Sequence, residues 1–437
     1  MEEPIVNVGI MSARRIKFEL LSPYILYQDM PLGMQEVVLS EGKIYLNGQN
    51  QGSEFILKAP DIHSSSFKLY NVTIGINFHW EQRGDQTFIG NLKFIIETDH
   101  LGDSRITAIN EVPMETYLES VISSEMSATS SLSLLYAHAI ISRSWILYQL
   151  RNKAHTTRYQ SNCITDERRI FWQDREDHAR FDVCADDHCQ RYEGITQISS
   201  SNVVKAVRET HGSVLMSDGE LCDARFSKCC GGITEKFSTC WEDKDYTYLR
   251  HVRDSDDETD MPDLTREDNA RKWILSSPES FCNVTDESIL DQALKGYDRR
   301  TTDFFRWKVE LDQSTLSVLA RGKTTVNFGT VTDIIPIKRS SSGRLEEIKI
   351  VGTERSCIIG KELEIRYAFS NSHLLSSAFV VDKEVRDNKL YFVFHGAGWG
   401  HGVGLCQIGA AVMGAKGYDY KQILQHYYPG SEITKLY

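Results

Sequence analysis

The chain lacks several features that would place it in a class at once. Only 9 of its 437 residues are proline, and it shows neither an internal repeat nor a low-complexity linker, so a repeat array or a disordered chain is not expected. No apolar run approaches the about 20 residues that a membrane-spanning helix needs. The start, MEEPIVNVGIMSARR, lacks the basic-then-apolar order of a secretory signal, so a cytoplasmic location stays open.

Basic residues are also in deficit. Asp and Glu together number 61 against 49 Lys and Arg, which gives a formal net charge of −12. A chain this acidic has no general attraction for nucleic acid or anionic lipid, so we expect no nucleic-acid partner, although a local basic groove would be compatible with this balance. The 41% hydrophobic and 10% aromatic content describes a folded globular protein.

The spacing of apolar residues predicts both strands and helices. Short β-branched and aromatic segments separated by Gly, Asn, Asp or Ser fill residues 5–110 and predict strands. Apolar residues then recur at helical spacing over 114–122, after Pro113, which predicts a helix that ends at or just before Glu125. A nearly all-apolar segment at about 133–150 predicts a buried second helix.

The rest of the chain alternates between the two kinds of element. Strand-like segments return after about residue 306, and the end of the chain reads as a Gly-rich turn and a helix at 419–428. Strands and helices that interleave without a βαβ rhythm predict an α+β fold. We expect four parts: a β-rich N-terminal part at 1–110, a helical segment at 111–255, an insertion of unknown role at 256–335, and a C-terminal part at 336–437.

Glu125 is the first candidate for a chemical role. It follows an amphipathic helix and precedes an apolar one, so it is expected to be partly desolvated and close to the negative end of a helix dipole. Both effects raise the pKa of a carboxyl group, which suits a general acid. Local pattern alone favours the alternative, a Glu in an exposed loop, because most Glu residues lie at the surface.

A glycine-rich segment near the C-terminus is the second candidate. Five glycines lie within residues 396–404, with Trp399, His401 and Gln407 among or beside them. An aromatic ring can stack on a sugar while polar neighbours bond its hydroxyls, and glycines allow close approach of the backbone. A turn that packs tightly for structural reasons explains the composition equally well. Phosphate binding is not expected, since neither a Walker lysine nor the dinucleotide glycine spacing follows a clear strand.

Three segments of the chain carry a resemblance. They read METYLESVISSEMS followed by LYAHAIISRSW, then LCDARFSKCCGGITE, then GAGWGHGVGLCQIGA followed by GYDYKQILQHYYPGS. In this order they resemble the stage II sporulation protein D and amidase enhancer family (SpoIID/LytB), with Arg143 and Ser144 in the matching place of the apolar helix. Two departures stand out: Cys406 replaces the family's usual serine, and Lys228-Cys229-Cys230 replaces a His-Ser-Thr-Ser run.

The resemblance implies a lytic transglycosylase that acts on peptidoglycan glycan strands in the cell envelope or periplasm. Glu125 would protonate the bond between N-acetylmuramic acid and N-acetylglucosamine and then take the proton of the attacking 6-hydroxyl, which leaves 1,6-anhydro-muramic ends. Unlike ordinary glycosidases, such an enzyme needs no second carboxylate. The residues expected to contact the substrate are Arg143, Ser144, Trp399, His401 and Gln407.

The same resemblance allows a second function, from a different class. Part of the family is thought to act as a non-catalytic glycan-binding enhancer that positions a separate cell-wall amidase. Such a protein needs the glycine-rich segment but does not need Glu125 to act as an acid.

A His/Cys cluster predicts a metal site. His178, Cys184, His188 and Cys189 offer two imidazoles and two thiols within twelve residues, enough to close a tetrahedral zinc site. Some members of the family carry a similar cluster. Four protein ligands would make this zinc structural, whereas three ligands and a water would make a zinc hydrolase that uses the two histidines. A disulfide formed by Cys184, beside surface histidines, is the alternative.

Four further cysteines lie close together in the sequence. Cys222, Cys229, Cys230 and Cys240 could form a second metal site, disulfides or buried free thiols. Adjacent cysteines rarely ligate one ion comfortably, so buried thiols are expected.

Overall fold

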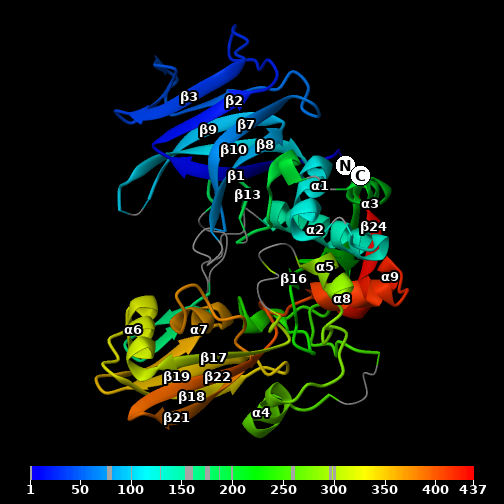
Figure 1. Cartoon of the computed structure of the whole chain (residues 1–437). Coiled ribbons are helices and arrows are strands. Elements are labelled where there is room, and N and C mark those ends of the chain that lie inside the picture. Colours follow the sequence, from blue (N-terminus) through cyan, green and yellow to red (C-terminus); the bar gives the residue numbers. More distant parts are fainter. Residues whose placement is uncertain are drawn as a thin grey trace.

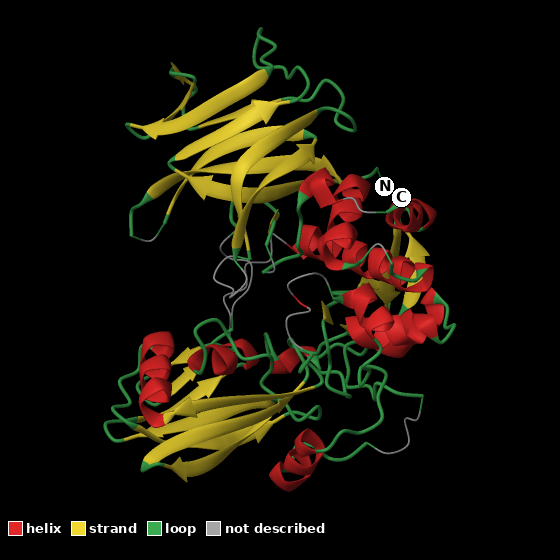
Figure 2. Ribbon diagram, in the orientation of Figure 1, coloured by secondary structure: helices red, strands yellow, loops and turns green. Residues whose placement is uncertain are grey.

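The computed structural model describes residues 2–75, 81–99, 101–127, 129–152, 161–172, 178–186, 188–197, 200–256, 261–294, 298 and 302–437. Figures 1 and 2 show a strand-rich lobe at the N-terminus, a group of helices beside it and a second strand-rich lobe formed later in the chain. This arrangement confirms the α+β prediction. No helix in the described part of the chain combines the length and the apolar character needed to cross a membrane.

The N-terminal lobe contains two sheets, one with the strand order β13-β1-β10-β9-β6 and the other with β5-β4-β3-β2-β7-β8. Their strands are β1 (Ile5–Ala13), β2 (Arg15–Leu20), β3 (Gly33–Ser40), β4 (Lys43–Leu46), β5 (Gln49–Asn50), β6 (Glu54–Leu57), β7 (Ser66–Ile74), β8 (Gln82–Ile89), β9 (Asn91–Thr98), β10 (Ser104–Pro113) and β13 (Val183–Cys184). In β2, Ile16, Phe18 and Leu20 are buried and alternate with more exposed residues, as a sheet with one buried face requires.

The helical group contains the helices of the first and third family motifs. It consists of α1 (Met114–Glu125), α2 (Leu132–Asn152), α3 (Ser201–Glu209), α8 (Gln407–Ala415) and α9 (Tyr420–Tyr427). Pro113 is the N-cap of α1 and α2 is buried along most of its length, so the helices expected at 114–122 and 133–150 are confirmed. α2 packs against α8 and α9, which brings the N-terminal and C-terminal motifs side by side (Figure 1).

Small sheets tie distant parts of the chain to these helices. β14 (Ser213–Ser217) pairs with β15 (Glu220–Leu221) and with the C-terminal strand β24 (Glu432–Lys435). β16 (Phe226–Ser227) pairs in parallel with β23 (Leu405–Cys406), so that Ser227 lies opposite Cys406. This short pairing joins the second and third family motifs.

The second lobe also contains two sheets, with the orders β11-β12-β20-β19-β18 and β17-β22-β21. Its strands are β11 (Cys163–Ile164), β12 (Arg168–Ile170), β17 (Arg306–Asp312), β18 (Val331–Arg339), β19 (Leu345–Gly352), β20 (Ser356–Gly360), β21 (Phe379–Arg386) and β22 (Lys389–Ala397). α4 (Glu267–Leu275), α6 (Gln313–Thr324) and α7 (Glu362–Ala368) pack against these strands. α5 (Glu287–Ala293) lies beside α8 in the helical group (Figure 1). The boundary expected at residue 335, between the insertion and the C-terminal part, lies within β18. β17, which precedes this boundary, pairs with β22, which follows it. The second lobe therefore contains strands from both sides of the boundary.

Candidate active site

Glu125 is the last residue of α1, and its side chain is buried. Its exposed fraction is 7%, which excludes the exposed-loop alternative. The carboxyl group lines a cleft of about 640 Å³. The N-terminal lobe contributes Val72, the Gly-rich segment Trp399, and α7 of the second lobe Arg366 to the walls of this cleft.

Three groups from distant parts of the chain contact the carboxylate of Glu125. The amide Nε2 of Gln407 donates to Oε2 over 3.3 Å, and the backbone N–H of Arg191 donates to Oε1 over 3.4 Å. The Nζ of Lys228 lies 3.8 Å from Oε2. Glu125, Lys228 and Gln407 each come from a different one of the three family motifs, so these motifs meet at a single carboxylate.

These contacts determine the charge of Glu125. Burial raises the pKa of its carboxyl group, but the charges of Lys228, Arg191 and His138 and the hydrogen bond from Gln407 outweigh burial and lower this pKa to about 2. The expectation of a raised pKa is therefore wrong for the free protein. The cations that reverse the shift are remote from Glu125 in the sequence, so no local pattern reveals them.

His138 is a site residue that the sequence reasoning missed. It lies fully buried on α2, and its Nε2 is 3.1 Å from the Nε2 of Gln407, the atom that also donates to Glu125. Burial lowers the pKa of His138 to about 4, so the ring is neutral near pH 7 and its Nε2 can accept this bond. The one available signal was a polar residue in the middle of a wholly apolar helix.

Lys228 connects Glu125 to a second buried carboxylate. Its Nζ lies 3.3 Å from Oδ2 of Asp298, and it also donates to the carbonyl of Ala293 over 3.4 Å. Asp298 is only 4% exposed and lines the same cleft. Asp298 therefore shares the ammonium group of Lys228 with Glu125.

The predicted residues of the Gly-rich segment lie at the same cleft. Trp399, His401 and Gln407 all line it, together with Trp241. The ring of His401 packs edge-on against Trp241 at 4.9 Å, and its Nδ1 accepts from the backbone N–H of Val403 over 3.0 Å. Burial and neighbouring arginines lower the pKa of His401 well below its usual value, so this ring is also neutral near pH 7. Contact of these side chains with a substrate stays a prediction.

The glycines of this segment serve close packing within the chain. Gly402 and Gly404 have φ angles of +77° and +71°. A Cβ at Gly404 would lie 2.0 Å from the carbonyl oxygen of Arg225. The neighbouring backbone pairs Cys229 with Trp399 through N–H···O bonds of 3.0 and 2.8 Å. The glycines therefore allow the second and third family motifs to approach each other, and this is what places Lys228 beside Gln407.

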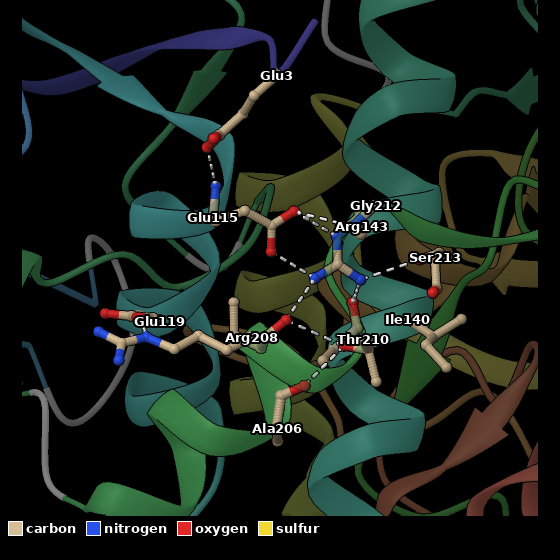
Figure 3. A network of polar contacts seen from close by, with 12 residues as sticks. Glu3, Glu115, Glu119, Ile140, Arg143, Ala206, Arg208, Thr210, Gly212 and Ser213 are labelled. Atoms are coloured by element: carbon tan, nitrogen blue, oxygen red, sulfur yellow. Dashed lines mark hydrogen bonds and ion pairs between the residues drawn. The ribbon is translucent and has the colours of Figure 1, made fainter. Parts of the chain in front are cut away.

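The structure does not bring Arg143 and Ser144 to the cleft. Arg143 is fully buried, and its guanidinium donates to both carboxylate oxygens of Glu115 over 2.8 and 2.6 Å and to the carbonyl of Ser213 over 2.9 Å (Figure 3). The hydroxyl of Ser144 accepts from the backbone N–H of Leu215 over 2.8 Å. Both side chains join α2 to its neighbours, so the conformation of the helices that carry Glu125 depends on them.

The four predicted metal ligands come together. The ligand atoms of His178, Cys184, His188 and Cys189 all lie within 4.8 Å of one another. Nδ1 of His188 lies 3.3 Å from Nε2 of His178, 3.5 Å from Sγ of Cys189 and 4.0 Å from Sγ of Cys184. Tetrahedral zinc with Zn–N of about 2.0 Å and Zn–S of about 2.3 Å separates two nitrogens by about 3.3 Å and a nitrogen from a sulfur by about 3.5 Å. The residues present therefore fit zinc.

The four remaining cysteines of the sequence cluster, Cys222, Cys229, Cys230 and Cys240, are all buried, and none forms a disulfide. They do not share one site. The thiol of Cys240 faces the carbonyl of His401 at 3.7 Å, whereas Cys230 lies near Cys282 and Cys406.

Comparison with known proteins finds similarity over defined parts of the chain. Residues 102–216 match the family model described as stage II sporulation protein, and residues 235–404 match a model described as a domain of unknown function. The fold and the site together define a class of protein. It is a strand-rich protein in which these motifs surround a buried carboxylate. The chain is similar to the stage II sporulation protein D and amidase enhancer family, whose family model matches residues 102–216.

Three relatives show how far the similarity extends. The chain is 27% identical to the amidase enhancer of Bacillus subtilis over 54% of its own length and 33% of the relative, so it spans about a third of that protein. It is 23% identical to the stage II sporulation protein D of Bacillus amyloliquefaciens, over 75% of this chain and 76% of the relative. It is 25% identical to an uncharacterised protein of Brachyspira hyodysenteriae, over 79% of this chain and 72% of the relative.

Proposed function

We propose that the cleft binds peptidoglycan glycan strands and that the protein is a lytic transglycosylase with Glu125 as its acid and base. The observation that carries this proposal is the meeting of the three family motifs at one buried carboxylate, in a cleft that also exposes Trp241 and Trp399. Aromatic faces beside polar groups suit sugar rings with their hydroxyls. A cell-envelope location follows from this substrate.

The reaction needs one carboxyl group and no water. Neutral Glu125 gives its proton to the glycosidic oxygen while the bond from the muramic acid C1 to that oxygen breaks. The 6-hydroxyl of the same muramic acid forms the new bond to C1, and its proton passes to the carboxylate of Glu125. The carboxyl group thus ends the cycle protonated, and the products are a free 4-hydroxyl and a 1,6-anhydro-muramic end.

The low pKa of Glu125 adds a condition to this reaction. In the free protein Glu125 is ionised near pH 7, because Lys228 and its other partners hold its pKa at about 2. The acid step therefore requires the substrate to weaken the contact between Lys228 and Glu125. A muramic acid without a stem peptide carries a free lactyl carboxylate, which can compete for Lys228, and exclusion of water by the strand favours the neutral carboxyl group.

Replacement of Glu125 by Gln tests the proposal. Glu125→Gln keeps the shape of the side chain but has no proton to give, so release of 1,6-anhydro ends from peptide-free strands should fall about a hundred- to ten-thousand-fold. Mass spectrometry of the released fragments measures this. Glu119→Gln is the matched control, because Glu119 lies on the same helix, pairs with Arg208 at 3.9 Å and does not line the cleft.

The outcome also tests the second candidate function. If the wild-type protein releases no 1,6-anhydro ends, the transglycosylase proposal fails. The similarity to a protein named amidase enhancer and the ionised state of Glu125 favour the alternative, a glycan-binding protein that acts with a cell-wall amidase. In that case Glu125→Gln should still bind strands and still stimulate the amidase.

We further propose that His178, Cys184, His188 and Cys189 hold a structural zinc ion. Four protein ligands leave no open position for a water, so this metal supplies no step of the reaction. Its contribution is to hold the segment that follows Cys189, which carries the backbone N–H of Arg191 to Glu125.

A further inference from the structure

A second group of metal-binding side chains lies away from the predicted zinc ligands. Cys230, Asp254, Cys282 and Cys406 place one ligand atom each within 4.8 Å of the others. All four residues are buried, with exposed fractions of 3% or less. They come from four separate segments of the chain, and Cys282 and Asp254 lie outside the three family motifs.

The spacing of the ligand atoms fits a single ion. Sγ of Cys230 lies 3.6 Å from Sγ of Cys282. Two sulfurs on a tetrahedral zinc ion with Zn–S of about 2.3 Å lie about 3.8 Å apart. Sulfurs that bind different irons of a multi-iron cluster lie farther apart than sulfurs that share one ion, so this spacing favours a mononuclear site.

The groups around these side chains orient them as metal ligands. The backbone N–H of Cys230 and that of Gly409 donate to Sγ of Cys406 over 3.2 and 3.5 Å, and such donors stabilise a thiolate. Asp254 accepts from the backbone N–H of Cys282 over 2.9 Å and from the hydroxyl of Tyr427 over 2.6 Å. Hydrogen bonds of this kind are typical of the shell that orients metal ligands.

Charge gives an independent reason for a cation. Asp254 is fully buried, and none of the ion pairs in the described part of the chain includes it. An ionised carboxylate without a cation is costly to bury. A divalent cation bound by all four groups removes it.

The two departures from the family pattern also meet at this place. Cys406 and the pair Cys229-Cys230 stand where the family usually has hydroxyl residues, and β16 pairs with β23 so that these segments adjoin. Of the cysteines in these departures, Cys230 and Cys406 contribute ligand atoms to the group. Together with Cys282 they complete a set of three sulfurs around Asp254.

We propose that Cys230, Cys282, Cys406 and Asp254 bind a second zinc ion. Of the two adjacent cysteines, Cys230 is the ligand, because its Sγ lies within 4.8 Å of the other three ligand atoms and the group does not include Cys229. The objection that neighbouring thiols ligate one ion poorly therefore does not apply. The site joins distant segments of the chain, among them the segment before Glu235, which carries Cys230, the loop before α5, which carries Cys282, and the start of α8, which follows Cys406.

This ion would act as a positioning element for Glu125. Lys228 lies two residues before Cys230, and Gln407 directly follows Cys406. Both side chains contact Oε2 of Glu125, at 3.8 and 3.3 Å. The metal would therefore fix the two groups that set the charge and orientation of this carboxylate, whatever reaction the cleft performs.

Metal analysis of the intact protein tests the proposal without any measurement of activity. Purified without chelator under reducing conditions, the wild-type chain should carry two zinc ions in native mass spectrometry. The double variant Cys184→Ser/Cys189→Ser, which removes two ligands of the first site, should retain one. Further replacement Cys282→Ser should remove it, whereas Cys222→Ser, a buried cysteine outside both sites, should leave it bound.

Cobalt substitution gives a second readout that does not depend on the double variant folding. Cobalt bound by three thiolates absorbs more strongly in the sulfur-to-metal charge-transfer region than cobalt bound by two. Wild-type protein should therefore show absorption from both sites, and Cys282→Ser should lose the larger share. A wild-type chain that binds no metal ion overturns the proposal, as does cobalt absorption that Cys282→Ser leaves unchanged or a mass that shows a disulfide between Cys230 and Cys282.

Discussion

At the scale of single residues, the proposed reaction depends on the charge of Glu125. Its burial and its position at the end of α1 both favour a neutral carboxyl group, yet Lys228, Arg191, His138 and Gln407 reverse the balance and bring its pKa to about 2. Asp298 competes for the same ammonium group, since Lys228 lies 3.3 Å from its Oδ2 and 3.8 Å from Oε2 of Glu125. Lys228 is therefore the residue whose replacement is most informative.

Lys228→Met should raise the pKa of Glu125. The free protein is active as an acid only when Glu125 is protonated, so kcat/KM should fall with rising pH above the pKa of Glu125. Removal of Lys228 moves this fall to higher pH, and a pKa that is higher by one increases the protonated fraction near pH 7 about tenfold. The pH profile of 1,6-anhydro product formation measures the change.

Lys236→Met serves as the control for this experiment, because Lys236 pairs with Asp245 at 3.6 Å and does not line the cleft. A Lys228→Met profile that coincides with the wild type would show that the ammonium does not set the charge of Glu125.

At the scale of elements, buried polar contacts hold the helices and loops that carry the site. Arg143 of α2 joins α1 through Glu115, which also accepts from the hydroxyl of Tyr437 over 2.6 Å, while its backbone N–H donates to Glu3 over 2.8 Å. Glu115 thus links α1 and α2 to residues 3 and 437. Figure 3 shows its contacts with Glu3 and Arg143.

Arg143→Ala should destabilise the fold by about 3–5 kcal/mol, because it leaves the carboxylate of Glu115 in a largely buried place without its cation. Denaturant unfolding measures the change. Arg208→Ala is the control, since Arg208 is exposed and pairs only at 3.9 Å with Glu119. If Arg143→Ala instead keeps its stability and loses affinity for glycan strands, the role expected from the family resemblance is correct.

The His/Cys loop is the second element with a testable role. Cys184 lies in β13, which pairs in parallel with β1, so that Val183 lies opposite Val8 and Cys184 opposite Gly9. Cys184→Ser should lower the melting temperature measured by circular dichroism. Product formation below that temperature should change little. Loss of activity at an unchanged melting temperature would indicate a catalytic zinc and favour the zinc-hydrolase hypothesis.

At the scale of the whole molecule, residues from distant parts of the chain line the cleft. Val72 of the N-terminal lobe, Glu125 of α1, Lys228, Trp399 and Arg366 of the second lobe all line it. Pairing of β16 with β23 and packing of α2 against α8 hold these parts together (Figure 1).

The sequence alone determined the features that depend on neighbouring residues. Apolar spacing and Pro113 predicted α1 and placed Glu125 at its end, because helix periodicity and capping are local. The short spacing from His178 to Cys189 predicted a four-ligand cluster, since so short a loop can close on one ion. The three motifs predicted the family.

Only the tertiary structure decided the features that depend on distant residues. The direction of the pKa shift of Glu125 reversed because Lys228 reaches it from another motif. Arg143 proved to pair with Glu115 inside the protein, and Asp298 joined the site through a shared cation. The Cys230–Cys282–Cys406 group likewise formed from separate segments. Charges and metal ligands act through space, so their partners depend on how the chain packs and are not visible in its local pattern.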